Sequence, residues 1–182
     1  TQVGGNIGTA LITLTDSSSE DGWTVCELSS FQLETIRDFR PNVAVCLNVT
    51  PNHMDRYDLF SDYAAAKHRL FMNQTEEDVV ILNADDEITA GWANGLKARV
   101  VMFSTAKELE QGLFLRGNDF IHRESGTERV LGNRSETTLK GIHNVQNILA
   151  ALAAGLACGA APESMRKTVS NFKGVEHRLE FV

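Results

Sequence analysis

The chain has 182 residues, of which 42% are hydrophobic and 23% charged, which is typical of one globular domain with a substantial core. A formal net charge of -7, without any lysine- or arginine-rich run, argues against nucleic acid or an anionic membrane as a partner. No apolar run has the length of a membrane span, no signal peptide is recognisable, and three cysteines in apolar runs indicate reduced thiols of a cytoplasmic protein.

Four short, Val-rich runs predict β-strands that are apolar on both faces, as in a covered parallel sheet. They are residues 23–28, 43–49, 78–84 and 98–103. Stretches of helical period follow the second and third runs, at residues 61–73 and 86–96. This alternation predicts an α/β fold, namely a Rossmann-like, mostly parallel sheet flanked by helices.

The pattern changes in the second half of the chain. The segments "LFLRGNDFIHRE" and "ERVLGN" place turn residues between alternating ones, which predicts a small antiparallel hairpin region. Apolar residues from Val145 to Leu156 then recur at three-and-four spacing and predict an amphipathic helix. Pro162 suits the first turn of a last helix.

Polar side chains follow the first three predicted strands, at the sheet edge where open α/β folds bind ligands. They are Glu27, His53 and the pair Asp85 and Asp86. Taken singly, Glu27 is better explained as a solvated or helix-capping carboxylate, and His53 alone is no more informative. Together, this carboxylate and imidazole would hold a divalent cation such as Mg²⁺, with water and phosphate in most remaining positions.

Lys67 falls on the helix stripe that is expected to be buried, four residues after Tyr63 and four before Phe71. One interpretation is a lysine whose stem covers apolar surface while its ammonium reaches water. The other is chemical, because a desolvated lysine loses proton affinity and its neutral amine reacts with CO₂. Carbamylation would turn this cation into an anion able to contact a metal.

Asn144 and Asn147 lie three residues apart at the start of the helix that contains Val145. Two amides on one helix face offer the donor and acceptor that the N6/N7 edge of adenine requires. Ordinary N-capping is the alternative, and it explains Asn144 better than Asn147.

Seven segments resemble, in the same order, the central ATP-binding domain of the Mur ligases. They are "GGNIG", "ELSSFQLE", "NVTPNHMDRY", "YAAAKHRLF", "LNADD", "GIHNVQNILAAL" and "GVEHRLE". The second is the most discriminating, since it varies in sister ligases and in folylpolyglutamate synthases. The resemblance implies a D-glutamate-adding ligase of peptidoglycan synthesis. In that reaction ATP phosphorylates the carboxylate of UDP-N-acetylmuramoyl-L-alanine, and the amine of D-glutamate attacks the acyl phosphate.

The same resemblance implies where metal ions would be held. Glu27 and His53 would contact Mg²⁺, a carbamylated Lys67 would support a second metal site, and Asn6 would lie by the metal and the substrate carboxyl group. Cations are needed there because acyl-phosphate formation brings anions together.

It also implies contacts to the two larger ligands. Ser29 and Gln32 would face the muramoyl substrate, Asn144 and Asn147 would hold adenine, and Arg178 would approach the ATP phosphates.

The phosphate-binding loop of the family is expected upstream of Thr1, because no Gly-Lys pair occurs in the chain. An N-terminal nucleotide-sugar domain and a C-terminal domain that presents D-glutamate are expected outside it as well. Residues 1–182 are therefore expected to be the central domain of a longer, monomeric protein and to be inactive alone. Uncovered apolar surface in this piece would favour self-association.

Two alternatives remain open on the sequence. One is another amide ligase of the superfamily, of Mur or folylpolyglutamate type, against which the "SSFQLE" segment argues. The other is a non-catalytic α/β binding module that keeps the fold without the metal chemistry.

Overall fold

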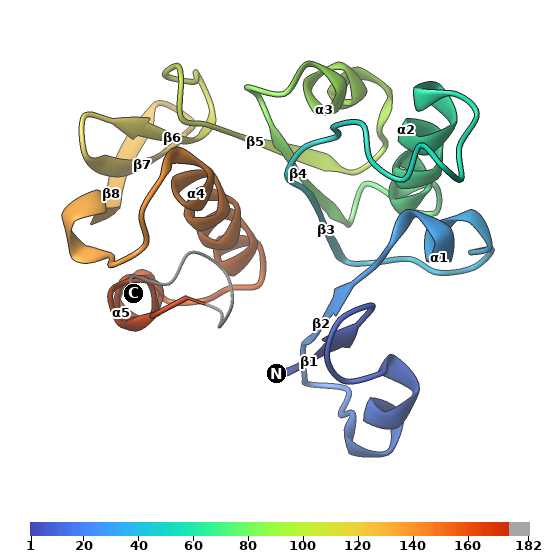
Figure 1. The fold of residues 1–182 in the computed structure, drawn as a ribbon. Coiled ribbons are helices and arrows are strands. Elements are labelled where there is room, and N and C mark those ends of the chain that lie inside the picture. Colours follow the sequence, from blue (N-terminus) through green and yellow to red (C-terminus); the bar gives the residue numbers. More distant parts are fainter. Residues whose placement is uncertain (175–182) are drawn as a thin grey trace, which may run out of the picture. The chain divides into compact units, whose positions relative to one another are not determined.

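The structure, a computed structural model, describes residues 1–174 (Figure 1). The chain forms two compact units. The first unit comprises Thr1–Phe39 and Pro51–Met72, and the second comprises Arg40–Thr50 and the chain from Asn73 onward.

A six-stranded sheet is the centre of the second unit, within the residues that the structure describes. Its strands, in spatial and chain order, are β3 (Val43–Cys46), β4 (Val79–Asn83), β5 (Arg99–Ser104), β6 (Gly112–Arg116), β7 (Asp119–Glu124) and β8 (Thr127–Asn133). Strands β3 to β6 are parallel, with Val43 opposite Val79 and Val79 opposite Arg99. The part of the sheet from β3 to β6 is thus parallel, as the sequence predicts.

The hairpin region predicted from the sequence is confirmed by the antiparallel strands β6, β7 and β8. Gly117 and Asn118 make the first tight turn, between paired residues Arg116 and Asp119. Ser125 and Gly126 make the second, both with positive φ, the backbone that two-residue hairpins require.

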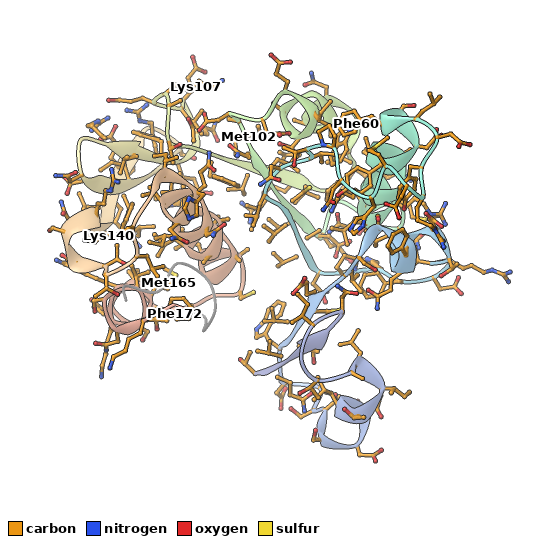
Figure 2. The ribbon with its side chains drawn as sticks, viewed as in Figure 1. Phe60, Met102, Lys107, Lys140, Met165 and Phe172 are labelled. Atoms are coloured by element: carbon orange, nitrogen blue, oxygen red, sulfur yellow. The ribbon has the colours of Figure 1, made fainter. Side chains whose placement is uncertain are left out.

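Helices complete the second unit. They are α3 (Glu87–Trp92), η3 (Ala93–Gly95), η4 (Arg134–Glu136), α4 (Ile142–Ala157) and α5 (Pro162–Asn171). Helix α4 packs on strands β3 to β6 through the apolar stripe read from the sequence, and α5 packs on β8 and α4 (Figure 1). Met165, labelled in Figure 2, is the buried residue of α5, and its sulfur would overlap a Cβ at Gly155, so the glycine allows the two helices to approach closely.

The core of the second unit is mostly aliphatic. Ile81, Phe103, Leu113 and Leu149 have no exposed surface. Val80, which alternates with Ile81 and so lies on the other face of β4, is also fully buried. Both faces of β4 are therefore covered, which explains why its sequence is apolar throughout.

The first unit is built from shorter elements. They are β1 (Gln2–Gly5), η1 (Leu11–Ser17), β2 (Thr24–Glu27), α1 (Ser30–Glu34), α2 (Phe60–His68) and η2 (Arg69–Phe71). Helices α1 and α2 pack on each other. Arg69 donates hydrogen bonds from its guanidinium to the carbonyl oxygens of Leu33 (2.8 Å) and Ile36 (2.7 Å), which satisfies the carbonyl end of α1.

One strand prediction needs correction. The run at residues 23–28 does form a strand, but β2 pairs in parallel with β1 in a separate two-stranded sheet. Val25 is 55% exposed and Val3, on β1, is 68% exposed. The apolar run correctly predicts a strand, but it does not show which residues cover that strand. The prediction that both faces of β2 are covered is therefore wrong.

Among the helices of residues 1–174, none has both the length and the apolar character that crossing a bilayer requires.

Candidate functional site

Glu27 is the last residue of β2, and its side chain is exposed. Its backbone carbonyl accepts a hydrogen bond of 2.7 Å from the N–H of Asn6, which directly follows β1. The parallel register, with Gly5 opposite Glu27, brings these two carboxyl-terminal strand ends together. Glu27 and Asn6 are thus neighbours, on a sheet edge of the kind that binds ligands in α/β folds.

Ser29 and Gln32 start helix α1, a role that the sequence analysis missed. The Ser29 Oγ accepts from the N–H of Gln32 (3.3 Å), and the Gln32 Oε1 accepts from the N–H of Ser29 (2.9 Å). This is a capping box, which satisfies two backbone donors at the helix end. The S-x-x-Q spacing was the available signal. Ser29, rather than Glu27, is therefore the capping residue.

His53 and Lys67 share a neighbour, Tyr63. The His53 and Tyr63 ring centroids are 6.4 Å apart, and the Lys67 Nζ lies 5.2 Å from the Tyr63 centroid. Tyr63 is only 5% exposed, whereas Lys67 is half-buried and His53 is exposed. An ammonium over a ring is attracted by the ring electrons, and carbamylation would remove this attraction because the lysine would become an anion.

Tyr63 belongs to an aromatic cluster with Phe31 and Tyr57, which the sequence analysis did not single out. Tyr57 stacks on Phe31 at 5.9 Å with an interplanar angle of 4°, and it meets Tyr63 edge-on at 5.4 Å. Burial raises the pKa of Tyr57, as does nearby Glu34, and the Tyr57 hydroxyl has no hydrogen-bond partner within the described residues. Phe31, Tyr57 and Tyr63 thus pack together as one aromatic cluster of the first unit.

The backbone of His53 has φ of 56°, in the left-handed region. This conformation costs a residue other than glycine about 1–2 kcal/mol. Two hydrogen bonds of 2.9 Å hold it: the His53 N–H donates to the Asn52 Oδ1, and the Arg56 N–H donates to the His53 carbonyl. Backbone strain of this kind persists where the surroundings fix it, often at functional sites.

The predicted metal ligands are only partly gathered. Among residues 1–174, no three His, Cys, Asp or Glu side chains are arranged to hold a metal ion by themselves. The side chains of Glu27 and His53 offer one carboxylate and one imidazole. Because Mg²⁺ keeps several waters and is usually held by one or two carboxylates together with substrate phosphates, the Glu27 carboxylate fits an ion that arrives with a nucleotide, and the His53 imidazole would be an additional nitrogen ligand.

Asn144 and Asn147 lie on one face of α4, as predicted, with the Asn147 Nδ2 3.5 Å from the Asn144 Oδ1. Asn144 does not cap the helix. Gly141 is the N-cap, with φ of 88°, and the Asn144 Nδ2 instead donates to the Lys140 carbonyl at 2.7 Å. The capping alternative for Asn144 is therefore wrong, and the first turn of α4 has no side-chain cap.

Asp85 and Asp86 serve the fold of the second unit. Asp86 caps α3 by accepting from the N–H of Thr89 (2.9 Å). Asp85 accepts from the Ser104 hydroxyl (2.5 Å) and the N–H of Thr105 (2.7 Å), which ties the end of β4 to the end of β5. Arg178 and most of the segment "GVEHRLE" lie outside the described residues.

Comparison with known proteins identifies the class. Residues 4–155 match the Mur ligase middle domain family, and the chain belongs to that family. Its fold is shared with the crystal structure of MurF from Acinetobacter baumannii, which superimposes with a TM-score of 0.67 at 21% identity, over 87% of this chain and 36% of that one.

Two curated relatives are more similar in sequence. The UDP-N-acetylmuramoylalanine–D-glutamate ligase of Koribacter versatilis is 49% identical over 181 residues, and that of Acidobacterium capsulatum is 48% identical over 184. Each alignment covers 100% of this chain and 40% of the relative. The chain thus spans two-fifths of the length of the ligases that it resembles.

Proposed function

We propose that this chain is the central, ATP-binding domain of a cytoplasmic ligase that joins D-glutamate to UDP-N-acetylmuramoyl-L-alanine. The observation that carries the proposal is the 49% identity over the whole chain to a ligase of that name. ATP would activate the muramoyl-alanine carboxylate as an acyl phosphate, which the amine of D-glutamate then attacks. Alone, the chain would bind nucleotide weakly at most and would not turn over.

The groups of the first unit would handle the charge in this reaction. Glu27 would hold Mg²⁺ together with His53, and Asn6, beside Glu27, would orient the substrate carboxyl group. A bound Mg²⁺ supplies positive charge where anionic oxygens meet. Lys67, carbamylated, would support a second ion, while Ser29 and Gln32 would contact the muramoyl substrate.

The second unit would bind the nucleotide base. Asn144 and Asn147 would present their amides to adenine from one face of α4, using the donor and acceptor positions that their contacts with Lys140 and with each other leave over. Arg178 would approach the ATP phosphates.

The test is an amide-ligation assay on the longer protein that contains this chain, with ATP, Mg²⁺, UDP-N-acetylmuramoyl-L-alanine and D-glutamate. ADP release and product mass should both require D-glutamate. Glu27→Gln should lower kcat/KM by about 100-fold or more, the range seen when one charge-stabilising group is removed. Glu20→Gln, which changes an exposed carboxylate of the same unit, is the matched control and should have no effect.

Turnover with another amino acid or with a folate, but not with D-glutamate, would favour the other superfamily ligases. If Glu27→Gln leaves the rate unchanged, Glu27 does not hold Mg²⁺ in the reaction. Carbamylation is tested separately with ¹³C-bicarbonate, which should give a carbamate signal that disappears in Lys67→Arg.

A further inference from the structure

The His53 ring packs against the ring of Phe31. The two ring centroids are 5.1 Å apart with an interplanar angle of 61°, an edge-to-face contact. This is a closer contact than the one between His53 and Tyr63, at 6.4 Å. Because His53 is otherwise exposed, these rings are the main restraint on its side chain that the described residues provide.

Phe31 is itself held from several directions. Tyr57 stacks on it, and the Arg56 guanidinium carbon lies 5.1 Å from its centroid. Arg56 also donates its backbone N–H to the His53 carbonyl, so one residue fixes both the ring and the strained backbone that it faces.

Helix α1, which carries Phe31, is also anchored at both ends. The Ser29–Gln32 capping box closes its start, and Arg69 binds the carbonyl oxygens at its end. A helix of five residues is not stable on its own, so these anchors determine where the Phe31 ring lies.

We propose that Phe31 is a positioning residue for His53. Its ring holds the imidazole in the orientation that the ligase reaction uses, while Tyr57 and Arg56 keep the Phe31 ring in place. This inference rests on the proposed function for its catalytic consequence, but its structural part stands without it. Phe31 does not itself touch the reacting groups.

The contrasting possibility is that Phe31 contributes only to packing. Phe60 provides the control, because it also contacts Tyr63, at 6.3 Å, and is half-buried at the start of α2 (Figure 2). No contact between Phe60 and His53 occurs among the ring pairs of the described residues. Removing the Phe60 ring therefore perturbs the same aromatic cluster without removing a ring that contacts His53.

The experiment compares Phe31→Leu, Phe31→Tyr and Phe60→Leu in the longer protein that contains this chain. Phe31→Leu should lower kcat about tenfold, the factor that one aromatic pair supports, with KM for ATP within twofold. Phe31→Tyr, which keeps the ring, should have a kcat close to that of the unmodified protein. Relaxation of ¹³C-labelled histidine should show the His53 ring more mobile in Phe31→Leu and unchanged in Phe60→Leu.

Two results would overturn the inference: His53 ring mobility that is the same in Phe31→Leu and the unmodified protein, or an equal loss of kcat in Phe60→Leu. If the protein has no ligase activity, the proposed function fails while the relaxation data still decide the positioning role. If Phe31→Leu does not fold, Arg56→Gln keeps the ring but removes its cation. Arg56→Gln should then make the His53 ring more mobile, though less so than is expected for Phe31→Leu. An unchanged mobility of the His53 ring in Arg56→Gln would contradict the inference.

Discussion

The two-stranded sheet of the first unit and the six-stranded sheet of the second both contain short parallel strands with valines. Val25 lies in β2, whose sequence is TVCE, and Val80 lies in β4, whose sequence is VVILN. Yet Val25 is 55% exposed and Val80 is fully buried. The second unit is thus stabilised by an aliphatic core around its sheet, whereas the first is organised by aromatic rings and helix-end contacts around its candidate site.

Charges are also used differently in the two units. In the second unit, Arg40 donates from Nε to the buried carboxylate of Asp78 at 2.7 Å. In the first unit, the cations of Lys67 and Arg56 lie over aromatic rings. Cations over rings stay available to a ligand, while the Arg40–Asp78 pair is committed to the fold.

The largest expected effect is in the aliphatic core. Phe103→Ala, at a fully buried position of β5, should lower the free energy of unfolding by about 3–5 kcal/mol, because it removes apolar contacts and leaves a cavity. Denaturant unfolding measures this loss. Phe172→Ala, at a position 47% exposed after α5 (Figure 2), is the control and should cost much less. Equal losses would mean that this core does not dominate the stability of the second unit.

Asp78→Asn should lower the free energy of unfolding by about 2 kcal/mol. The reason is that the buried carboxylate of Asp78, which accepts hydrogen bonds from Arg40 and from the Thr75 N–H (2.7 Å), loses its charge. The hydrogen bond from Arg40 lowers the pKa of Asp78, and the Thr75 N–H adds to this, against the opposing effect of burial. A lowered pKa in the folded state means that the stabilisation is complete above the unfolded value of about 3.9. It is lost as the pH falls through the lower folded value.

Unfolding curves from pH 7 to pH 3 test this prediction. The difference between the unmodified chain and Asp78→Asn should be constant near neutral pH and should shrink below about pH 4. Asp58→Asn, at an exposed position of the first unit, should change little at any pH. A difference that grows on acidification would contradict the assigned cause.

A single substitution at matched positions tests the two sheets directly. Val80→Thr should lower the free energy of unfolding by about 1–3 kcal/mol, because it buries a hydroxyl group at a position where no hydrogen-bond partner is arranged for it. Val25→Thr should stay within about 0.5 kcal/mol, as exposed substitutions do. If Val25→Thr is as costly as Val80→Thr in denaturant unfolding, β2 is covered in solution and the contrast between the sheets is wrong.

The smallest effect is expected in the aromatic cluster. Tyr57→Phe keeps the ring that stacks on Phe31 and removes a buried hydroxyl without a partner in the described residues, so stability at pH 7 should be nearly unchanged. Because burial raises the pKa of Tyr57, the unmodified chain should lose more stability than Tyr57→Phe as the pH rises above about 10. Tyr57→Leu, which removes the ring, should be clearly destabilising in thermal melts.

Much of the fold could be predicted from the sequence, because hydrophobic period and turn residues act locally. The strand at 78–84, the hairpins around Gly117 and Gly126, and the helices at Val145 and Pro162 are all confirmed. Strand β1 and helix α1 were not predicted, since four or five residues are too short to show a period. Which face of a strand is covered depends on distant residues, as β2 shows.

The candidate site was harder to predict. The position of Glu27 at the end of a strand and the pairing of Asn144 with Asn147 follow from spacing alone. The contact between Phe31 and His53 joins residues 22 positions apart through a loop whose left-handed backbone no local pattern indicated. That Glu27 and His53 hold Mg²⁺, and that a carbamylated Lys67 supports a second ion, stays a prediction.

The capping box determines what the turn before α1 can offer to any ligand. It uses the Gln32 Oε1 as the acceptor for both the N–H and the hydroxyl of Ser29. The Gln32 Nε2, which can only donate, makes no hydrogen bond that is seen within residues 1–174. This turn is therefore suited to a partner rich in acceptor oxygens, and a ligand that demanded the Gln32 oxygen would have to unwind the start of the helix.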